Sequence, residues 1–263
     1  MNWSTANRPG KRLPGSLGRA AVSARADVWV IDLDRSMSGA ARADAVLTPE
    51  ERARAGRFRR RDDALRWSLS RAALRLTLAD RLGVAPQAVV LEHGSHGKPR
   101  VRVGTGMPPL FFNVSHSGGL AVLCLSADAP VGVDVEAVRS IDGLDAIVGR
   151  VGSASERSAL RTLAGAARMR AFFALWTRKE AVVKALGKGL HLPLERFSVA
   201  LLPGEPVRVL ASELDELPPQ SCCLRDLQLA DGYAGALAMI GASDLSVRVR
   251  GFDPGRILEL PAS

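Results

Sequence analysis

Short segments with strand-like alternation and longer segments with helical periodicity take turns along the chain. From Ala26, the sequence DVWVIDLD places apolar residues at alternate positions, which predicts a strand. Residues 48–82 then follow a helical pattern. Thr48 and Glu51 form a capping box at the start of this helix, and Gly83 is a natural stop at its end.

The middle of the chain predicts more strands and a second helical region. Residues 111–126 and 131–136 are apolar strand regions that we expect to pair around the turn ADAP. Residues 154–186 predict one or two helices, and the later segments PVRVLAS, CCLRDLQLA and GYAGALAMIG predict strands. This arrangement is typical of an α+β fold.

A faint internal repeat divides the chain into two parts. The segment Trp67–Arg75 resembles Trp176–Lys184, because both contain Trp, a small hydroxyl residue, Ala, two small apolar residues and a base in the same order. This register places Arg71 opposite Glu180. We expect two similar α+β halves, although chance similarity between two alanine-rich helices is the alternative. The expected organisation is a flexible basic N-terminal tail at 1–25, a first half at 26–137, a second half at 138–250 and a C-terminal tail at 251–263.

Composition narrows the class of protein. The 263 residues are 47% hydrophobic and 24% charged, which indicates a folded protein with a substantial core. No apolar run is long enough for a membrane helix, and the basic start lacks the apolar centre of a signal peptide. Three cysteines without zinc-ligand spacing favour a reduced, cytoplasmic protein.

The net charge of +9 indicates an acidic partner or a polyphosphate ligand, although an Arg-rich genome would produce the same excess. The basic charge also raises the possibility of a nucleic-acid-binding protein. Aromatic residues make up only 5% of the chain, and no nucleic-acid-binding motif is visible, so we do not expect nucleic acid as a partner. Only five of the 36 basic residues are lysines, which makes each lysine informative, and four of them fall in two short motifs.

The strand VGVDVE carries the first candidate site. Because side chains alternate along a strand, Gly132, Asp134 and Glu136 face one side and the valines face the other. The two carboxylates then lie about 7 Å apart, and one cation could draw them together. Acidic residues are also common on solvent-facing strands, so D-x-E alone is weak evidence for a metal.

The helix FFALWTRKEAVVKALGKGL, residues 172–190, carries the second candidate site. Glu180 and Lys184 lie one turn apart on the flank of an apolar stripe, where an ordinary surface ion pair is the alternative. Lys179 falls within the stripe, so its charge must reach a partner or extend to water.

Two polar loops complete the candidate site. The segment FNVSHSGG presents Ser115 and His116 beside glycines, and hydroxyl groups and amides of this kind bind phosphate. The turn HGKPR holds Lys98 rigidly. A structural histidine and a plain basic turn are the alternatives. Carboxylates without Cys or His ligands indicate a hard cation, Mg²⁺ before Mn²⁺, and the bases would bind phosphate oxygens. No P-loop or kinase motif is present, which disfavours ATP hydrolysis.

The order and spacing of these motifs resemble the Sfp type of 4′-phosphopantetheinyl transferases, which activates surfactin synthetase. The matching segments are GKP at 97–99, FNVSHSGG at 112–119, VGVDVE at 131–136 and LWTRKEAVVKALGKGL at 175–190, followed by PLERFSV. The resemblance runs from about residue 27 to residue 245 and implies the pseudo-dimer fold of that family.

The resemblance implies an enzyme of the holo-[acyl-carrier-protein] synthase type. Such an enzyme moves the 4′-phosphopantetheine arm of coenzyme A to a serine of an apo acyl or peptidyl carrier protein and releases adenosine 3′,5′-bisphosphate. It would depend on Mg²⁺ and act in secondary metabolite biosynthesis as a cytoplasmic monomer, with no membrane or nucleic-acid partner. The alternative is a non-catalytic module that binds coenzyme A or a carrier. Loss of the catalytic residues would support it, but Asp134, Glu136, Glu180 and Lys184 are all present.

The resemblance also implies roles for single residues. Asp134, Glu136 and Glu180 would bind Mg²⁺, and Glu180 would also act as base on the carrier serine. Lys184 would contact the phosphates and assist the leaving group, and Trp176 and Lys179 would shape the site. The residues implied to bind coenzyme A are Lys98, Ser115, His116, Arg54, Arg66 and Lys184.

One region departs from the family pattern. Where relatives often carry two bases that serve the 3′-phosphate, this chain has Glu51 and Arg54, and a small polar residue is replaced by Trp67. Arg54 and Arg66 are the bases expected to compensate.

Overall fold

The computed structural model describes residues 23–94, 96–189, 192–202 and 204–260. The expected N-terminal tail, residues 1–25, lies outside the described residues up to Ser23, where the first strand begins. No helix in the described ranges is both long and apolar enough to cross a membrane.

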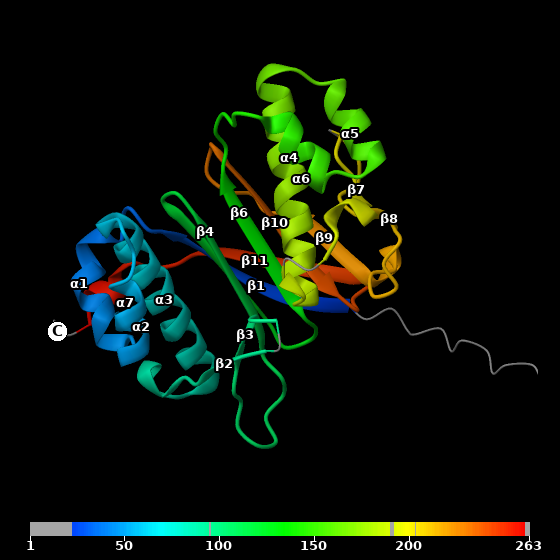
Figure 1. Cartoon of the computed structure of the whole chain (residues 1–263). Coiled ribbons are helices and arrows are strands. Elements are labelled where there is room, and N and C mark those ends of the chain that lie inside the picture. Colours follow the sequence, from blue (N-terminus) through cyan, green and yellow to red (C-terminus); the bar gives the residue numbers. More distant parts are fainter. Residues whose placement is uncertain (1–22, 95, 190–191, 203, 261–263) are drawn as a thin grey trace, which may run out of the picture.

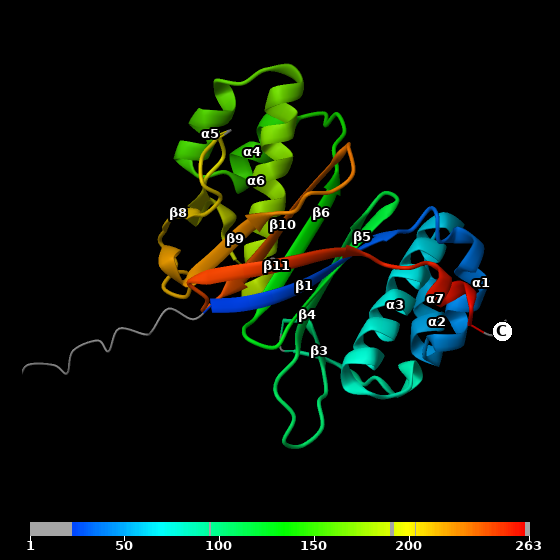
Figure 2. The same cartoon turned by 180° about the vertical axis from the view of Figure 1, so that it is seen from behind.

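Two α+β units lie side by side in the molecule (Figures 1 and 2). The first sheet has the strand order β11-β1-β5-β4 and contains β1 (Ser23–Asp32), β4 (Phe111–Ser117), β5 (Leu120–Ser126) and β11 (Asp244–Gly251). The helices of this unit are α1 (Ala40–Ala43), α2 (Pro49–Ala55), α3 (Arg61–Leu82) and α7 (Gly255–Leu258). Leucines of α3 form one core with the apolar face of the sheet.

The second sheet has the order β6-β10-β9, with β6 (Val131–Ala137), β9 (Cys222–Asp226) and β10 (Tyr233–Ile240). Its helices are α4 (Leu144–Val151), α5 (Ala154–Arg161) and α6 (Gly165–Leu186). Two short hairpins complete the fold, β2 (Leu91–His93) with β3 (Pro99–Val101), and β7 (Phe197–Val199) with β8 (Val209–Ser212). The expected α+β fold with two similar halves is confirmed.

The two parts of the sequence exchange one strand each. Strand β11, near the end of the chain, runs parallel to β1, from Ser23 opposite Asp244 to Val30 opposite Gly251. Strand β6 pairs with β10, not with β5. The expected pairing around the turn ADAP is therefore wrong. The reason is that β1 and β4 already occupy both edges of β5.

The helical region predicted at 48–82 is two helices, because the chain leaves the helix at Gly56 and re-enters it at Arg61. The capping box of Thr48 and Glu51 forms as predicted. The left-handed glycine that ends α3 is Gly83, with φ of 67°.

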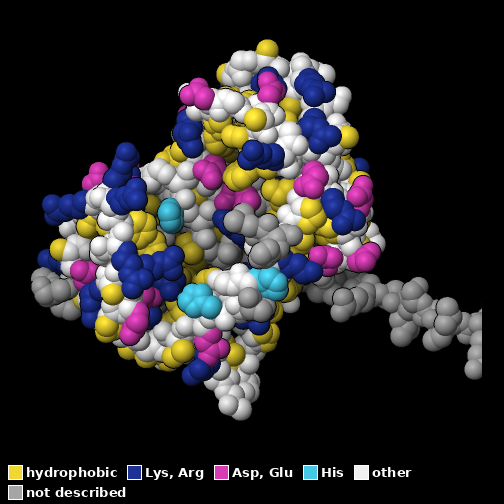
Figure 3. Space-filling view, in the orientation of Figure 1, with side chains coloured by type: hydrophobic (Ala, Val, Ile, Leu, Met, Phe, Trp, Pro, Cys, Tyr) yellow, Lys and Arg dark blue, Asp and Glu magenta, His cyan; other side chains and the backbone are white. Residues whose placement is uncertain are grey.

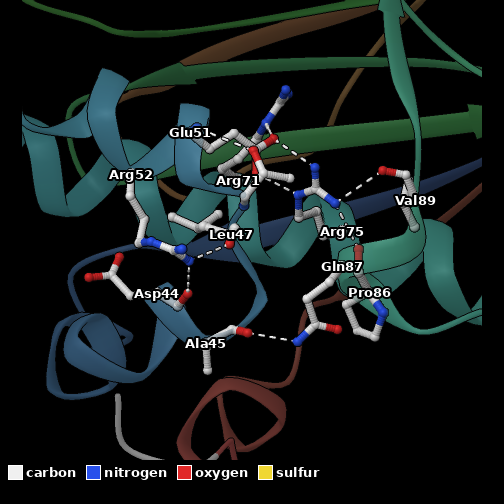
Figure 4. Close-up of polar contacts among 11 residues, drawn as sticks. Asp44, Ala45, Leu47, Glu51, Arg52, Arg71, Arg75, Pro86, Gln87 and Val89 are labelled. Atoms are coloured by element: carbon white, nitrogen blue, oxygen red, sulfur yellow. Dashed lines mark hydrogen bonds and ion pairs between the residues drawn. The ribbon is translucent and has the colours of Figure 1, made fainter.

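The capping glutamate of α2 also binds two arginines of α3 (Figure 4). An oxygen of the Glu51 carboxylate lies 2.5 Å from Nε of Arg71, and the other lies 2.5 Å from Nε of Arg75. Arg75 is buried and also donates to the carbonyls of Pro86 and Val89. Glu51 is thus a buried residue that ties α2 to α3 and is not free to bind a ligand of the proposed site.

The second half repeats this arrangement with a lysine. Nζ of Lys179 lies 2.5 Å from Oε2 of Glu156, the capping glutamate of α5, and donates to the carbonyls of Leu194 and Phe197. Lys179 is only 1% exposed. Its charge reaches a partner, as its place in the apolar stripe requires, but this partner lies in the core and not in the expected site.

These equivalent bases correct the register of the repeat. Helices α3 and α6 both have 22 residues, and both end before a left-handed glycine, Gly83 or Gly187. Aligning the two ends places Arg75 opposite Lys179. Glu180 is then opposite the apolar Leu76, and not opposite Arg71 as the sequence match suggested.

The C-terminal segment, expected as a tail at 251–263, packs against the first half as far as residue 260. Phe252 and Ile257 are buried in the core formed by α3 and the first sheet. Ile257 packs so close to Gly39 that a Cβ on that glycine would lie 3.0 Å from its side chain.

Candidate active site

Helix α6 lies directly on strand β6 at Gly132. A Cβ atom at this position would lie 2.1 Å from the carbonyl oxygen of Ala181 and 2.3 Å from the amide nitrogen of Ala185. Only a residue without a side chain fits there. Because Asp134 and Glu136 share the strand face of Gly132, they lie on the side of β6 that α6 covers.

Asp134 is bound by two side chains from different halves of the chain. Its Oδ1 accepts from Nζ of Lys184 at 2.6 Å and from Oγ of Ser115 at 2.8 Å, and the Lys184 Nζ also donates to the Ser115 hydroxyl at 2.9 Å. Asp134 is only 3% exposed, and burial raises the pKa of its carboxyl group despite the opposing charge of Lys184.

Glu180 lies one helical turn before Lys184 and within the electrostatic field of both strand carboxylates. Burial raises the pKa of Glu180 most, and the negative charges of Asp134 and Glu136 raise it further. Lys184 opposes these effects only in part. A carboxyl group with a raised pKa is well suited to accept a proton from a substrate hydroxyl.

The donor chemistry of these three carboxylates fits a hard divalent cation. Oδ2 of Asp134 is buried and has no hydrogen-bond partner among the described residues. The negative charges of Asp134 and Glu136, which raise the pKa of Glu180, would be balanced by such a cation. The carboxylates are not yet gathered around one point, since no group of three ligand side chains in the described part of the chain could hold a metal as it stands.

Strand β4 joins the two halves through alternate polar side chains. Oδ1 of Asn113 accepts from the amide of Val133 at 2.8 Å, and Oγ of Ser117 accepts from the amide of Ala137 at 3.1 Å. The Ser117 hydroxyl also donates to Oε2 of Glu136 at 2.7 Å. Side chains therefore replace the backbone ladder along this part of the boundary between β4 and β6.

Asn113 and Ser117 were not identified from the sequence as site residues. The signal for both residues is the alternation of small polar residues in FNVSHSGG, which places Asn113, Ser115 and Ser117 on one face of the strand.

Two hollows meet at Lys98, and Figure 3 shows carboxylate and histidine side chains in the depression between the halves. A hollow of about 260 Å³ is lined by Lys98, Glu180 and Lys184 together with Asn113 and glycines of neighbouring loops. A more apolar cleft of about 560 Å³ adjoins it. Nζ of Lys98 donates to the carbonyls of Val131 at 2.9 Å and Ala185 at 3.3 Å, and burial lowers its pKa to about 8.

The other residues expected to bind coenzyme A lie further out. His116 is exposed, and partial loss of water around its ring, followed by the charge of Lys184, lowers its pKa. Arg66 forms an ion pair with Asp34 at 2.9 Å. Arg54 lies over the ring of Trp67, 5.5 Å from its centroid.

Arg54 and Arg66 do not line either hollow among the described residues. The structure thus brings together the carboxylates, Lys184, Ser115 and Lys98. These groups lie at the junction of the two α+β halves, where their charges and hydrogen-bond donors are of the kind that bind phosphate oxygens.

Comparison with known proteins identifies the class. Residues 130–238 match the 4′-phosphopantetheinyl transferase superfamily, and residues 35–128 match the N-terminal region of a 4′-phosphopantetheinyl transferase. The 4′-phosphopantetheinyl transferase HetI of Nostoc sp. is 33% identical over 221 residues, which cover 83% of this chain and 93% of the relative.

Two relatives from Bacillus agree with this result. Sfp of Bacillus subtilis is 30% identical over 214 residues, which cover 80% of this chain and 90% of the relative. The transferase psf-1 of Bacillus pumilus is 37% identical over 152 residues, which cover 58% of this chain and 63% of the relative. The chain therefore belongs to the 4′-phosphopantetheinyl transferase superfamily, and the expected Sfp-type resemblance and transferase class are confirmed.

Proposed function

We propose that this protein transfers the 4′-phosphopantetheine arm of coenzyme A to a serine of an apo acyl or peptidyl carrier protein and releases adenosine 3′,5′-bisphosphate. Family membership supports the reaction. The observation that carries the assignment of residues is the convergence of Asp134, Glu180 and Lys184 where α6 meets β6.

The reaction is a phosphoryl transfer, in which positioning and charge neutralisation supply most of the rate. The serine oxygen of the carrier attacks the phosphorus that bears the pantetheine, and the bond to the second phosphate breaks. Glu180 accepts the serine proton, which its raised pKa favours. Lys184 faces the negative charge that develops on the departing adenosine bisphosphate.

We propose that Asp134, Glu136 and Glu180 hold Mg²⁺. The cation would neutralise charge on the pyrophosphate oxygens. The chain itself orients two of these ligands, since Ser115 and Lys184 hold Asp134 and Ser117 holds Glu136. Lys184 would share Asp134 with the cation, which places a base beside the phosphates.

Coenzyme A is proposed to lie across the two halves. Lys98, Ser115, His116 and Lys184 would bind its phosphates, and Arg54 and Arg66 would extend the site along the helices of the first half. Since both halves belong to one chain, a cytoplasmic monomer with one coenzyme A site would be sufficient.

Intact-mass spectrometry tests the function. An apo carrier incubated with coenzyme A and Mg²⁺ should gain the mass of one phosphopantetheine arm. Asp134→Asn and Glu180→Gln should lose this transfer, whereas Glu92→Gln, an exposed carboxylate paired with Arg102, should not. No mass gain with several unrelated carriers would contradict the proposal.

The metal has a test that does not depend on activity. Mg²⁺ should raise the melting temperature of the free protein, because a ligand that binds only the folded state stabilises it. Asp134→Asn should lose most of this increase. An equal increase in both proteins would remove Asp134 from the metal site.

A further inference from the structure

A second charged hollow lies among the helices of the second half. It measures about 380 Å³ and is lined by Asp145, Val148, Gly149, Arg157, Arg161 and Arg168. Helices α4, α5 and α6 all contribute to it. Figure 3 shows dark-blue basic side chains gathered over this helical end of the molecule. Three arginines against one aspartate give the lining an excess of positive charge.

The backbone adds to this positive charge. Arg168 lies in the first turn of α6, where the helix dipole is positive and a cation is unfavourable. That turn contains no acidic residue, and no side chain caps it. Asp145 pairs with Arg168 and offsets one charge only. Among the described residues, neither of the remaining bases forms an ion pair with a carboxylate. Arg157 donates to the carbonyl of Gly152, and Arg161 is exposed.

One buried donor beside this hollow is unsatisfied. Among the residues that the structure describes, only two buried side-chain polar atoms lack a hydrogen-bond partner. One is Oδ2 of Asp134, at the proposed cation site. The other is Nε of Arg168, a side chain that lines the hollow. A buried polar atom without a partner is costly and calls for a missing ligand.

We propose that this hollow is an oxyanion-binding site separate from the catalytic centre. Guanidinium groups match the geometry of phosphate and carboxylate oxygens, and an anion in the hollow would neutralise the excess of positive charge. Arg168 and Glu180 are twelve positions apart on α6, which separates them by about 18 Å along the helix axis. The same phosphates of coenzyme A therefore cannot occupy both places.

The oxyanion has two sources, and the experiment distinguishes them. Free phosphate is the first. The second is a carboxylate of the carrier protein, which rests on the proposed function, because a carrier that presents its serine at Glu180 is large enough to span this distance.

NMR of the arginine Nε–H groups in the full chain tests the site without measuring activity. The Arg168 signal, assigned by its absence in Arg168→Gln, is followed during titration with inorganic phosphate and then with apo carrier. Arg161→Gln removes one base from an exposed position, and Arg150→Gln is the matched control on α4, outside the hollow.

A saturable shift with phosphate, weakened about tenfold by Arg161→Gln and unchanged by Arg150→Gln, would support a free anion as the ligand. A shift with carrier only would support a carrier carboxylate, if Arg161→Gln also raises the KM for carrier and leaves the KM for coenzyme A unchanged. No shift with either ligand would overturn the proposal. A shift in a protein that transfers nothing to any carrier would keep the anion site and contradict the enzyme function instead.

Discussion

Replacing Gly132 by alanine tests whether the contact between α6 and β6 sets the geometry of the site. The new Cβ would lie 2.1 Å from the carbonyl oxygen of Ala181, whereas ordinary contact begins at 3.4 Å. Both of the nearest atoms are backbone atoms, so no side-chain rotation relieves the clash. The helix must move away from the strand by roughly 1 Å, and overpacking of this kind costs about 1–3 kcal/mol.

The movement would be felt directly at the catalytic groups. Ala181 and Ala185 flank Lys184 on the same helical segment, and a misplacement of about 1 Å can lower a rate by roughly 10²-fold. Urea denaturation followed by circular dichroism measures the stability, and transfer of phosphopantetheine measures the rate. Gly251→Ala is the control, since it also changes a strand glycine but its Cβ meets nothing within 4 Å. If Gly132→Ala behaves like Gly251→Ala in both assays, the contact does not position the site.

Three further predictions concern charged groups. Glu180→Gln should have a larger free energy of unfolding than wild type near pH 7.5, because ionisation of a carboxyl group with a raised pKa destabilises the folded protein as pH rises through that pKa. Denaturant melts at two pH values check this, and a less stable variant would contradict it. The pKa of Lys98 is lowered to about 8 from 10.5, so the folded state releases this proton at a lower pH than the unfolded state. Between pH 8 and 10.5 the free energy of unfolding of the wild type should therefore rise by up to about 3 kcal/mol relative to that of Lys98→Met. Parallel pH curves for the two proteins would refute this. Glu51→Gln leaves two arginines of α3 without their carboxylate and should cost about 3–5 kcal/mol in calorimetry, whereas Glu213→Gln, in an exposed pair, should cost less than about 1 kcal/mol.

Features that depend on neighbours within a few residues could be predicted from the sequence. The alternation of VGVDVE correctly placed Gly132, Asp134 and Glu136 on one face of β6. The capping box at Thr48 and the stop at Gly83 were also correct. Strand alternation and helix caps are local, because each is set by the geometry of one or two turns of chain. The motif order then indicated the family, which the comparisons confirmed.

Features that depend on contacts between distant residues required the tertiary structure. Lys179 and Glu180 are adjacent in one motif, yet Lys179 binds Glu156 in the core, whereas Glu180 lines the hollow beside Lys184. The sequence match also shifted the repeat by several positions, because Ala-rich helices resemble each other in more than one register. The common helix ends and the equivalent buried bases together decided the alignment.

The contacts at the boundary between the halves could not be predicted from the sequence either, because they join residues that are far apart along the chain. Ser115 and Lys184 form a hydrogen bond across 69 positions of the chain. Whether a serine binds a phosphate, a carboxylate or a neighbouring amide depends on which strand lies beside it, and the edges left free by the rest of the sheet decide that partner. The sequence by itself therefore determined which faces carry the chemistry, and the packing of β4, β6 and α6 decided how those faces meet.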